Sequence, residues 1–460
     1  ISRGSHTVNT SPSPTKVQPA SSNAYAWYVV IVLMLCYALS FIDRQILSLM
    51  VEPIKADLGL SDTEFSLLQG MSFAIFYTFV GLYMGKLADT RNLQKLIVAG
   101  ITAWSLMTAL CGMAKSFGHL FIARVGVAVG EATLSPAAYS ITGDYFTKEK
   151  LGRAMSTYSV GVFLGSGLAF VVGGALIASI PAVTDLPLLG ELKAWQMVFI
   201  IVGLAGIPFA LLVLTVREPL RGRFSEQQID PEEKVSVAKS LRHFTSRWRF
   251  YGPHFLGFSM LTTIGYAFHS WVPAFFIRTH GWEASEIGIS YGTINIITAP
   301  LGVLIGGWFG DRLLKAGRSD AYLVGPIIGA IPLWIFASLA TAPFISAPVI
   351  SLGLLAALHF FASFHAGMAV AALHTATPIT MRSQATAAYL FVINLVGLGG
   401  GPLVVALLTD FFFQNEQLIG SSLMIVGGCA TPIAIFMLTL AARQYPKNVA
   451  QAAAAHPPKE

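Results

Sequence analysis

Two pairs of oppositely charged residues lie inside apolar stretches of this chain. Asp43 and Arg44 are adjacent, and Arg124 and Glu131 are seven residues apart within a run of small and aliphatic residues. That spacing puts Arg124 and Glu131 on one face of a helix, about 10 Å apart along its axis. A charged side chain deep in a bilayer costs about 2.5–3.5 kcal/mol. These residues therefore indicate a site that faces a partner or a water-filled cavity.

The chemistry of these residues suits an anion and a proton. A guanidinium stays charged and binds phosphate or carboxylate through two donors, so Arg44 and Arg124 are candidate substrate-binding residues. Acids inside membranes commonly carry protons, so Glu131 and Asp43 are candidates for proton coupling, and Glu131 also for substrate binding. Counting residues along the first and fourth spans puts Asp43 and Arg124 at a similar depth in the membrane, so we expect these two to pair. Arg44 and Glu131 then remain as the candidates for binding the substrate and the proton. The alternative is a salt-bridge network that only holds two helices together.

The later apolar spans contain a second set of polar side chains that are candidates for substrate binding. They are Tyr266, His269, His359 and His365. Imidazoles change charge near neutral pH. Aligning Gly167 with Gly401 places His365 opposite Glu131. Phenylalanines between the histidines would suit an acyl chain, and packed helix contacts are the alternative for all of these side chains.

Long apolar helices must position these residues. Hydrophobic residues make up 54% of the chain and charged residues 11%, which is typical of a polytopic membrane protein. The basic residues lie in short loops between apolar runs, so nucleic-acid binding is excluded. The sequence contains no Walker loop and no HExxH motif, and we therefore expect neither an enzyme nor a cofactor or metal site.

The apolar runs predict an all-α protein with twelve membrane-spanning helices, at about 20 residues each. The predicted spans are 27–50, 64–87, 95–115, 118–142, 151–180, 194–216, 250–278, 284–311, 321–343, 346–375, 381–412 and 418–443. A charged linker, 217–249, separates a half at 25–216 from a half at 250–445. Residues 1–24 are predicted to form a disordered tail and residues 446–460 a second tail.

The distribution of basic residues predicts the orientation. Most of the 29 Lys and Arg residues lie on the side that holds both termini. The positive-inside rule places that side in the cytoplasm. Short loops and the absence of an N-terminal targeting segment lead us to expect a bacterial inner membrane.

A short motif recurs in the two halves. Gly85 precedes Asp89 by four residues at the end of the second span, as Gly307 precedes Asp311 at the end of the eighth. With Gly85-x-Leu87-Ala88-Asp89-x-Arg91, the chain resembles the major facilitator superfamily. The resemblance implies two pseudo-symmetric six-helix halves, a monomer, and a cytoplasmic latch. The latch residues would be Gly85, Asp89, Arg91, Asp311 and Arg312, the alternative being a solvated turn.

A closer resemblance, to the Spinster family of lipid transporters, covers residues 40–174 most densely. The matching motifs are Asp43-Arg44, Gly59-Leu60-Ser61-Asp62, Leu67-Leu68-Gln69, Trp104-Ser105-Leu106, Arg124-x-Gly126-x-x-x-Gly130-Glu131-Ala132, Asp144-x-Phe146 and Gly165-Ser166-Gly167-Leu168. The family is associated with sphingosine-1-phosphate export and lysophospholipid movement. By this resemblance, Asp43, Arg44, Arg124 and Glu131 match the family's central polar residues.

These observations predict a secondary transporter that moves an anionic, lipid-like amphiphile by alternating access, coupled to protons and embedded in membrane lipids. Glycines in the fifth and eleventh spans permit rocking of the helices or tight static packing. Two other functions stay open. One is a small organic-anion:proton symporter, and the other is a membrane sensor that binds a lipid without moving it.

Overall fold

The computed structural model describes residues 23–187, 190–219 and 236–454, and nearly all of them are helical. The first-half elements are α1 (Asn23–Gln45), η1 (Ile46–Leu49), α2 (Val51–Leu58), α3 (Asp62–Ser66), η2 (Leu67–Met71), α4 (Ser72–Thr90), α5 (Leu93–Cys111), α6 (Phe117–Glu131), α7 (Leu134–Tyr145), α8 (Lys148–Ser179), β1 (Val183–Leu186), β2 (Gly190–Lys193) and α9 (Ala194–Val213). The N-terminal tail predicted at 1–24 lies almost wholly outside the described residues.

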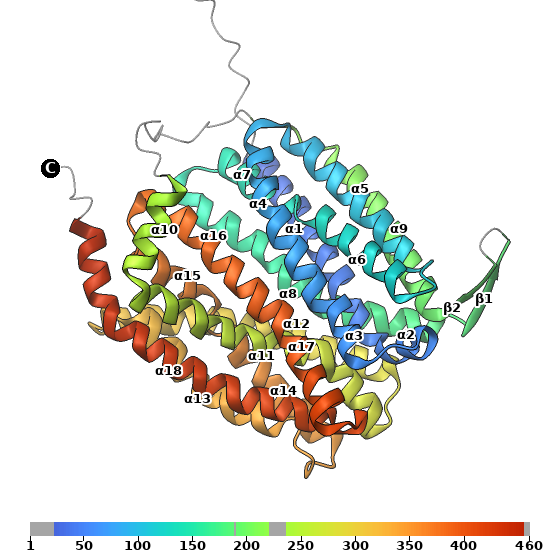
Figure 1. Cartoon of the computed structure of the whole chain (residues 1–460). Helices are drawn as coiled ribbons and strands as arrows, with labels where there is room; N and C mark the ends of the chain where they lie inside the picture. The colour runs from blue at the N-terminus through green and yellow to red at the C-terminus, as the bar shows by residue number, and fades with distance from the viewer. Residues whose placement is uncertain (1–22, 188–189, 220–235, 455–460) are drawn as a thin grey trace, which may run out of the picture.

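The second half begins after a short helix, α10 (Val237–Ser246), which lies in the predicted linker. Its elements are α11 (Trp248–His280), α12 (Ala284–Lys315), α13 (Ala321–Leu339), α14 (Pro348–Ser363), α15 (Ala366–Thr375), η4 (Ile379–Met381), α16 (Arg382–Ile393), η5 (Asn394–Gly399), α17 (Gly400–Leu407), η6 (Leu408–Phe413), η7 (Glu416–Leu418) and α18 (Ile419–Ala454). Figure 1 shows the hairpin β1–β2 projecting at one end of the bundle, near α2 and α3, and α10 at the opposite end.

Eleven helical segments of the described chain are long and apolar enough to cross a membrane. The remaining predicted span, the seventh at 250–278, corresponds to α11, which is 33 residues long but is made less apolar by its histidine, tyrosine, serine and threonine residues. The prediction of an all-α fold is confirmed.

The boundaries differ from the predictions in two places. Residues between α8 and α9 form an antiparallel hairpin in which Val183 pairs with Lys193. At the other end of the chain, α18 continues through the predicted tail as far as Ala454. Its last turns are rich in alanine, which has the highest helix propensity.

A glycine ends α2, and a capping box begins α3. Gly59 closes α2 in a left-handed conformation with φ of 67°, which glycine adopts without strain. Ser61 and Glu64 then form a capping box at the start of α3. These caps make the motif Gly59-Leu60-Ser61-Asp62 a tight connection between the first two spans.

Glycines allow α8 to touch one helix of each half. A Cβ at Gly165 would overlap the main chain of Ala38 in α1, and a Cβ at Gly292 in α12 would lie 2.6 Å from the carbonyl oxygen of Gly167. No side chain fits between these backbones. The close approach of α8 to α1 and α12 brings the two halves together around the charged residues.

We expect Gly165→Ala to lower the thermal unfolding temperature of the protein, because the methyl group would force α8 away from Ala38. Overpacking of this kind costs about 1–3 kcal/mol. The measurement is a melting curve of the detergent-solubilised protein. Gly152→Ala in the same helix is the control, since nothing lies within 4 Å of its Cβ position. Equal melting temperatures for the two variants would contradict the packing argument.

Candidate functional site

Arg44, in the last turn of α1, is the centre of the site. Its Nε donates to Oε2 of Glu131 at 2.5 Å, and the residues are 9% and 1% exposed. Three aromatic rings enclose the guanidinium, with Cζ 4.8 Å from the ring centroid of Phe41, 4.5 Å from Phe73 and 4.6 Å from Tyr77. The environment of the Arg44 charge is therefore one carboxylate and an aromatic cage.

Asp43 and Arg124 do meet, but not as an ion pair. Arg124 Nη1 donates to the main-chain carbonyl of Asp43 at 3.3 Å, and Asp43 Oδ2 accepts from Thr108 Oγ1 at 3.3 Å. The Oδ1 of Asp43 and the Nε and Nη2 of Arg124 have no hydrogen-bond partner within the described chain. Depth alone predicted a carboxylate–guanidinium pair here and left Arg44 and Glu131 unpaired. The structure reverses this, because adjacent residues on α1 point about 100° apart and only Arg44 faces Glu131.

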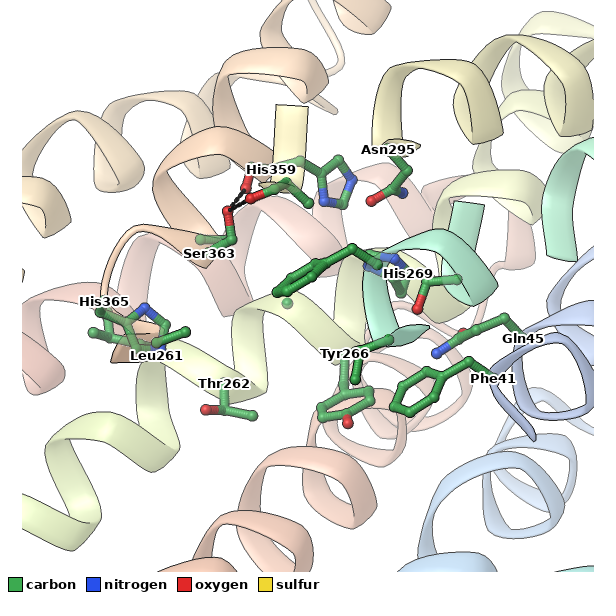
Figure 2. A pocket seen from close by; sticks show the side chains of 17 residues that line it. Phe41, Gln45, Leu261, Thr262, Tyr266, His269, Asn295, His359, Ser363 and His365 are labelled. Atoms are coloured by element: carbon green, nitrogen blue, oxygen red, sulfur yellow. Dashed lines mark hydrogen bonds between the residues drawn. The ribbon is translucent and has the colours of Figure 1, made fainter. Parts of the chain in front are cut away.

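A cavity of about 270 Å³ lies beside this pair, between the two halves. Its walls contain no Asp, Glu, Lys or Arg and are mainly apolar. Its polar lining residues are Gln45, Ser166, Thr262, Tyr266, His269, Asn295, His359, Ser363 and His365 (Figure 2). Gln45 and Tyr266 also line a small adjoining cavity that contains Arg44. A ligand in the main cavity therefore has Arg44 next to it.

The four polar residues predicted from the second half all line this cavity. His359 Nε2 lies 2.6 Å from the hydroxyl of Tyr291, and its ring is 4.8 Å from that of His269. The ring of His365 stacks on Phe258 at 5.7 Å. Figure 2 shows His365 near Leu261, at the opposite end of the view from Asn295.

The phenylalanines of α14 do not form a wall of the cavity. Phe360 and Phe361 contact each other at 4.9 Å, and Phe361 stacks on Phe336 of α13 at 5.9 Å. They pack helices together, and the aromatic lining comes instead from Phe41, Phe163 and Tyr266. Asn295, Gln45, Ser166 and Ser363 were missed in the sequence. The only available signal was a polar residue within an apolar span, which does not reveal which way the side chain points.

The predicted latch residues lie at the ends of α4 and α12. The side chain of Asp89 lies outside the described part of the structure, and Arg91 is exposed. Asp311 Oδ1 accepts from the hydroxyl of Tyr322 at 3.3 Å, and the guanidinium of Arg312 lies 5.4 Å from the Trp308 ring centroid. Gly85 has open space around its Cβ position. The latch remains a prediction.

A second charge cluster joins the halves at the α2–α3 end. Arg278 of α11 donates from Nη1 to Asp62 Oδ2 at 2.7 Å and from Nε to Glu52 Oε1 at 2.7 Å. Lys55 bonds to Asp62 and, at 2.8 Å, to Glu416 of the second half. The side chains of Asp62, Arg278 and Lys55 are 0%, 4% and 6% exposed. From the sequence, Lys55 and Arg278 are recognisable only as basic residues in loops on the same side of the membrane. Their contacts with Asp62 are not predictable from it.

Comparison with known proteins agrees with this architecture. The profile of the Major Facilitator Superfamily matches residues 33–402. An MFS-type efflux pump of Mycolicibacterium smegmatis is 28% identical, over 93% of this chain and 95% of the pump. Protein spinster homolog 1 of Xenopus tropicalis is 27% identical, over 84% of this chain and 74% of its own. A crystal structure of a bacterial homolog of the human lysosomal transporter Spinster, inward-facing and unoccupied, has a TM-score of 0.78 at 26% identity, covering 93% of this chain and 99% of that one.

Proposed function

The chain belongs to the Major Facilitator Superfamily, and from this premise we propose that it transports an anionic amphiphile, a sphingosine-1-phosphate-like lipid or a lysophospholipid, by alternating access. The observation that carries the proposal is the buried Arg44–Glu131 pair beside a mainly apolar cavity whose walls contain no Asp, Glu, Lys or Arg. An anionic head fits the guanidinium and an acyl tail fits the apolar lining. The resemblance of residues 40–174 to the Spinster family of lipid transporters supports this substrate class.

The ion pair supplies a mechanism for proton coupling. Glu131 and the anionic head of the substrate are both ligands for the one guanidinium of Arg44. A protonated Glu131 no longer holds Arg44, which is then free to bind the head. Release of the head returns Arg44 to Glu131, whose proton leaves. Substrate binding and protonation of Glu131 therefore favour each other, which is the condition for coupled transport.

The two ends of the bundle fit the two sides of a membrane. Because most basic residues lie at the end with the termini, we assign that end to the cytoplasm. The cluster of Arg278, Asp62 and Lys55 then closes the outer end. The cavity would exchange with the cytoplasm in this state, as in the inward-facing Spinster homolog.

Flux into sealed proteoliposomes tests the proposal. The probes are labelled sphingosine-1-phosphate, a lysophospholipid and a short dicarboxylate, each with and without an imposed pH gradient. Movement of either lipid by the purified protein supports an amphiphile transporter. Movement of the dicarboxylate alone rejects the lipid substrate, and binding of lipid without flux identifies a sensor.

We expect Glu131→Gln to remove the pH dependence of transport, because glutamine resembles the permanently protonated acid. The measurement is the initial rate of lipid flux across a series of pH values. Glu191→Gln, which alters an exposed carboxylate on β2, is the control and should keep the wild-type profile. An unchanged profile in Glu131→Gln would assign the coupling to another group.

One observation favours a second candidate function. The cavity, at about 270 Å³, is slightly smaller than the usual range for ligand pockets, which begins at about 300 Å³. A small organic anion would fill it without a tail. Competition between short-chain and long-chain anions for the same site separates this symporter from the amphiphile transporter.

A further inference from the structure

A cluster of polar side chains without a permanent charge lies at the wall of the cavity that the second half contributes. His269 on α11, Asn295 on α12 and His359 on α14 line the cavity, and the fourth member, Tyr291 on α12, contacts His359 without lining it. His359 bonds to Tyr291 at 2.6 Å, and its ring lies 4.8 Å from that of His269. Asn295 follows Tyr291 by one helical turn, so the two side chains lie on the same face of α12. We call these four residues the second-half polar cluster.

Asn295 is the member whose hydrogen bonds are incomplete. It is 2% exposed and it lines the cavity, and its amide Nδ2 makes no hydrogen bond of normal geometry within the described chain, its interaction there being with the side chain of Tyr291. A buried polar group left unpaired is costly, and such a group in a cavity wall fits a ligand. Figure 2 shows the amide of Asn295 close to the rings of His359 and His269.

The surroundings determine what kind of ligand group fits. No Asp, Glu, Lys or Arg lines the cavity, and the nearby Arg44 already holds Glu131 in the adjoining space. The cluster therefore has no fixed charge to bind a second anion or an ammonium group. An amide and two imidazoles offer both donors and acceptors, and a hydroxyl group, which donates and accepts, is their natural partner.

We propose that Asn295, with His269 and His359, is a second substrate subsite that binds an uncharged hydroxyl group. This inference rests on the proposed function and restricts its class of substrates. The substrate carries an anionic group for Arg44 and a hydroxyl on the neighbouring part of its chain. A lysophospholipid with a free hydroxyl on its glycerol belongs to this class, and an unsubstituted alkyl phosphate does not.

The test compares two probes that differ in that hydroxyl. They are 1-oleoyl lysophosphatidic acid and its 2-deoxy analogue, and the readout is their affinity for the purified protein by competition against labelled lysophosphatidic acid. We expect the wild type to bind the hydroxylated lipid about three- to tenfold more tightly, the usual value of one neutral hydrogen bond. Asn295→Leu should bind the two probes equally and should bind the deoxy lipid as the wild type does.

Two further variants separate a binding role from a structural one. Thr293→Val alters an exposed residue of the same helix and should keep the wild-type preference. Asn295→Ser retains a hydroxyl group at this position and should keep part of the wild-type preference for the hydroxylated lipid. Equal affinity of the wild type for both probes overturns the subsite without using any variant. An Asn295→Leu variant that loses affinity for both probes equally also overturns it.

The outcome is distinct from failure of the proposed function. If the wild type binds the lysolipids through Arg44 without preferring the hydroxyl, the subsite is wrong and the amphiphile transporter stands. If the wild type binds neither lipid, the short-chain alternative is tested in the same way. The two probes are then glucuronate, which carries hydroxyl groups, and hexanoate, which does not. A preference for glucuronate that Asn295→Leu removes would keep the subsite and reject the lipid. Equal affinity for glucuronate and hexanoate would reject the subsite as well as the lipid substrate.

Discussion

Replacing Arg44 by Ala is expected to reduce transport of the anionic substrate by about a hundredfold or more, since losing one partner of a buried, hydrogen-bonded charge pair between protein and ligand costs about 3 kcal/mol or more of binding free energy. Arg44 is the only guanidinium among the residues of the cavity that adjoins the main one. The variant also leaves Glu131 buried without its partner. The measurement is lipid flux into proteoliposomes, together with a melting curve.

Companion variants separate loss of the binding site from loss of the fold. Arg44→Ala combined with Glu131→Gln removes both charges, so it should melt closer to the wild type than Arg44→Ala alone and still fail to transport. Arg318→Ala alters an exposed arginine that pairs with Asp320, and it should change neither property, because exposed pairs contribute little. Wild-type flux in the double variant would show that Arg44 does not bind the substrate.

Replacing Arg278 by Ala is expected to open the α2–α3 end of the molecule. Arg278 joins the second half to Asp62 and Glu52 of the first half. Its loss removes charge-assisted hydrogen bonds worth about 2 kcal/mol or more, which corresponds to a shift of about 30-fold in the equilibrium between the closed and open states of that end. Lys55 still pairs with Asp62, so the buried carboxylate keeps one partner.

A distance between spin labels measures this opening. Lys115 and Gln417 are exposed residues at the α2–α3 end, one on each half, and cysteines there can be labelled after Cys429→Ser. Cys36 and Cys111 are buried. In Arg278→Ala the distance distribution should gain a longer component that is minor in the parent protein. An unchanged distribution would mean that other contacts close this end.

The sequence by itself determined the fold class and the residues of the charged site. Long apolar runs can hide their backbone polar groups in a bilayer only as helices or closed barrels, so helical spans were predictable from composition and length. Asp43, Arg44, Arg124 and Glu131 were visible for the same reason, because a charge inside an apolar run is costly and must be compensated.

Only the tertiary structure decided which of these residues are partners and what else faces the cavity. Arg44 and Glu131 are 87 positions apart, and their contact depends on the rotation of α1 about its axis against α6. A rotation of one residue, about 100°, would have exchanged Asp43 and Arg44. For the same reason, the sequence did not reveal that Asn295 faces the cavity or that Arg278 contacts residues of the other half. Hydropathy and spacing give the depth of a residue in the membrane, whereas the packing of neighbouring helices sets the direction in which its side chain points.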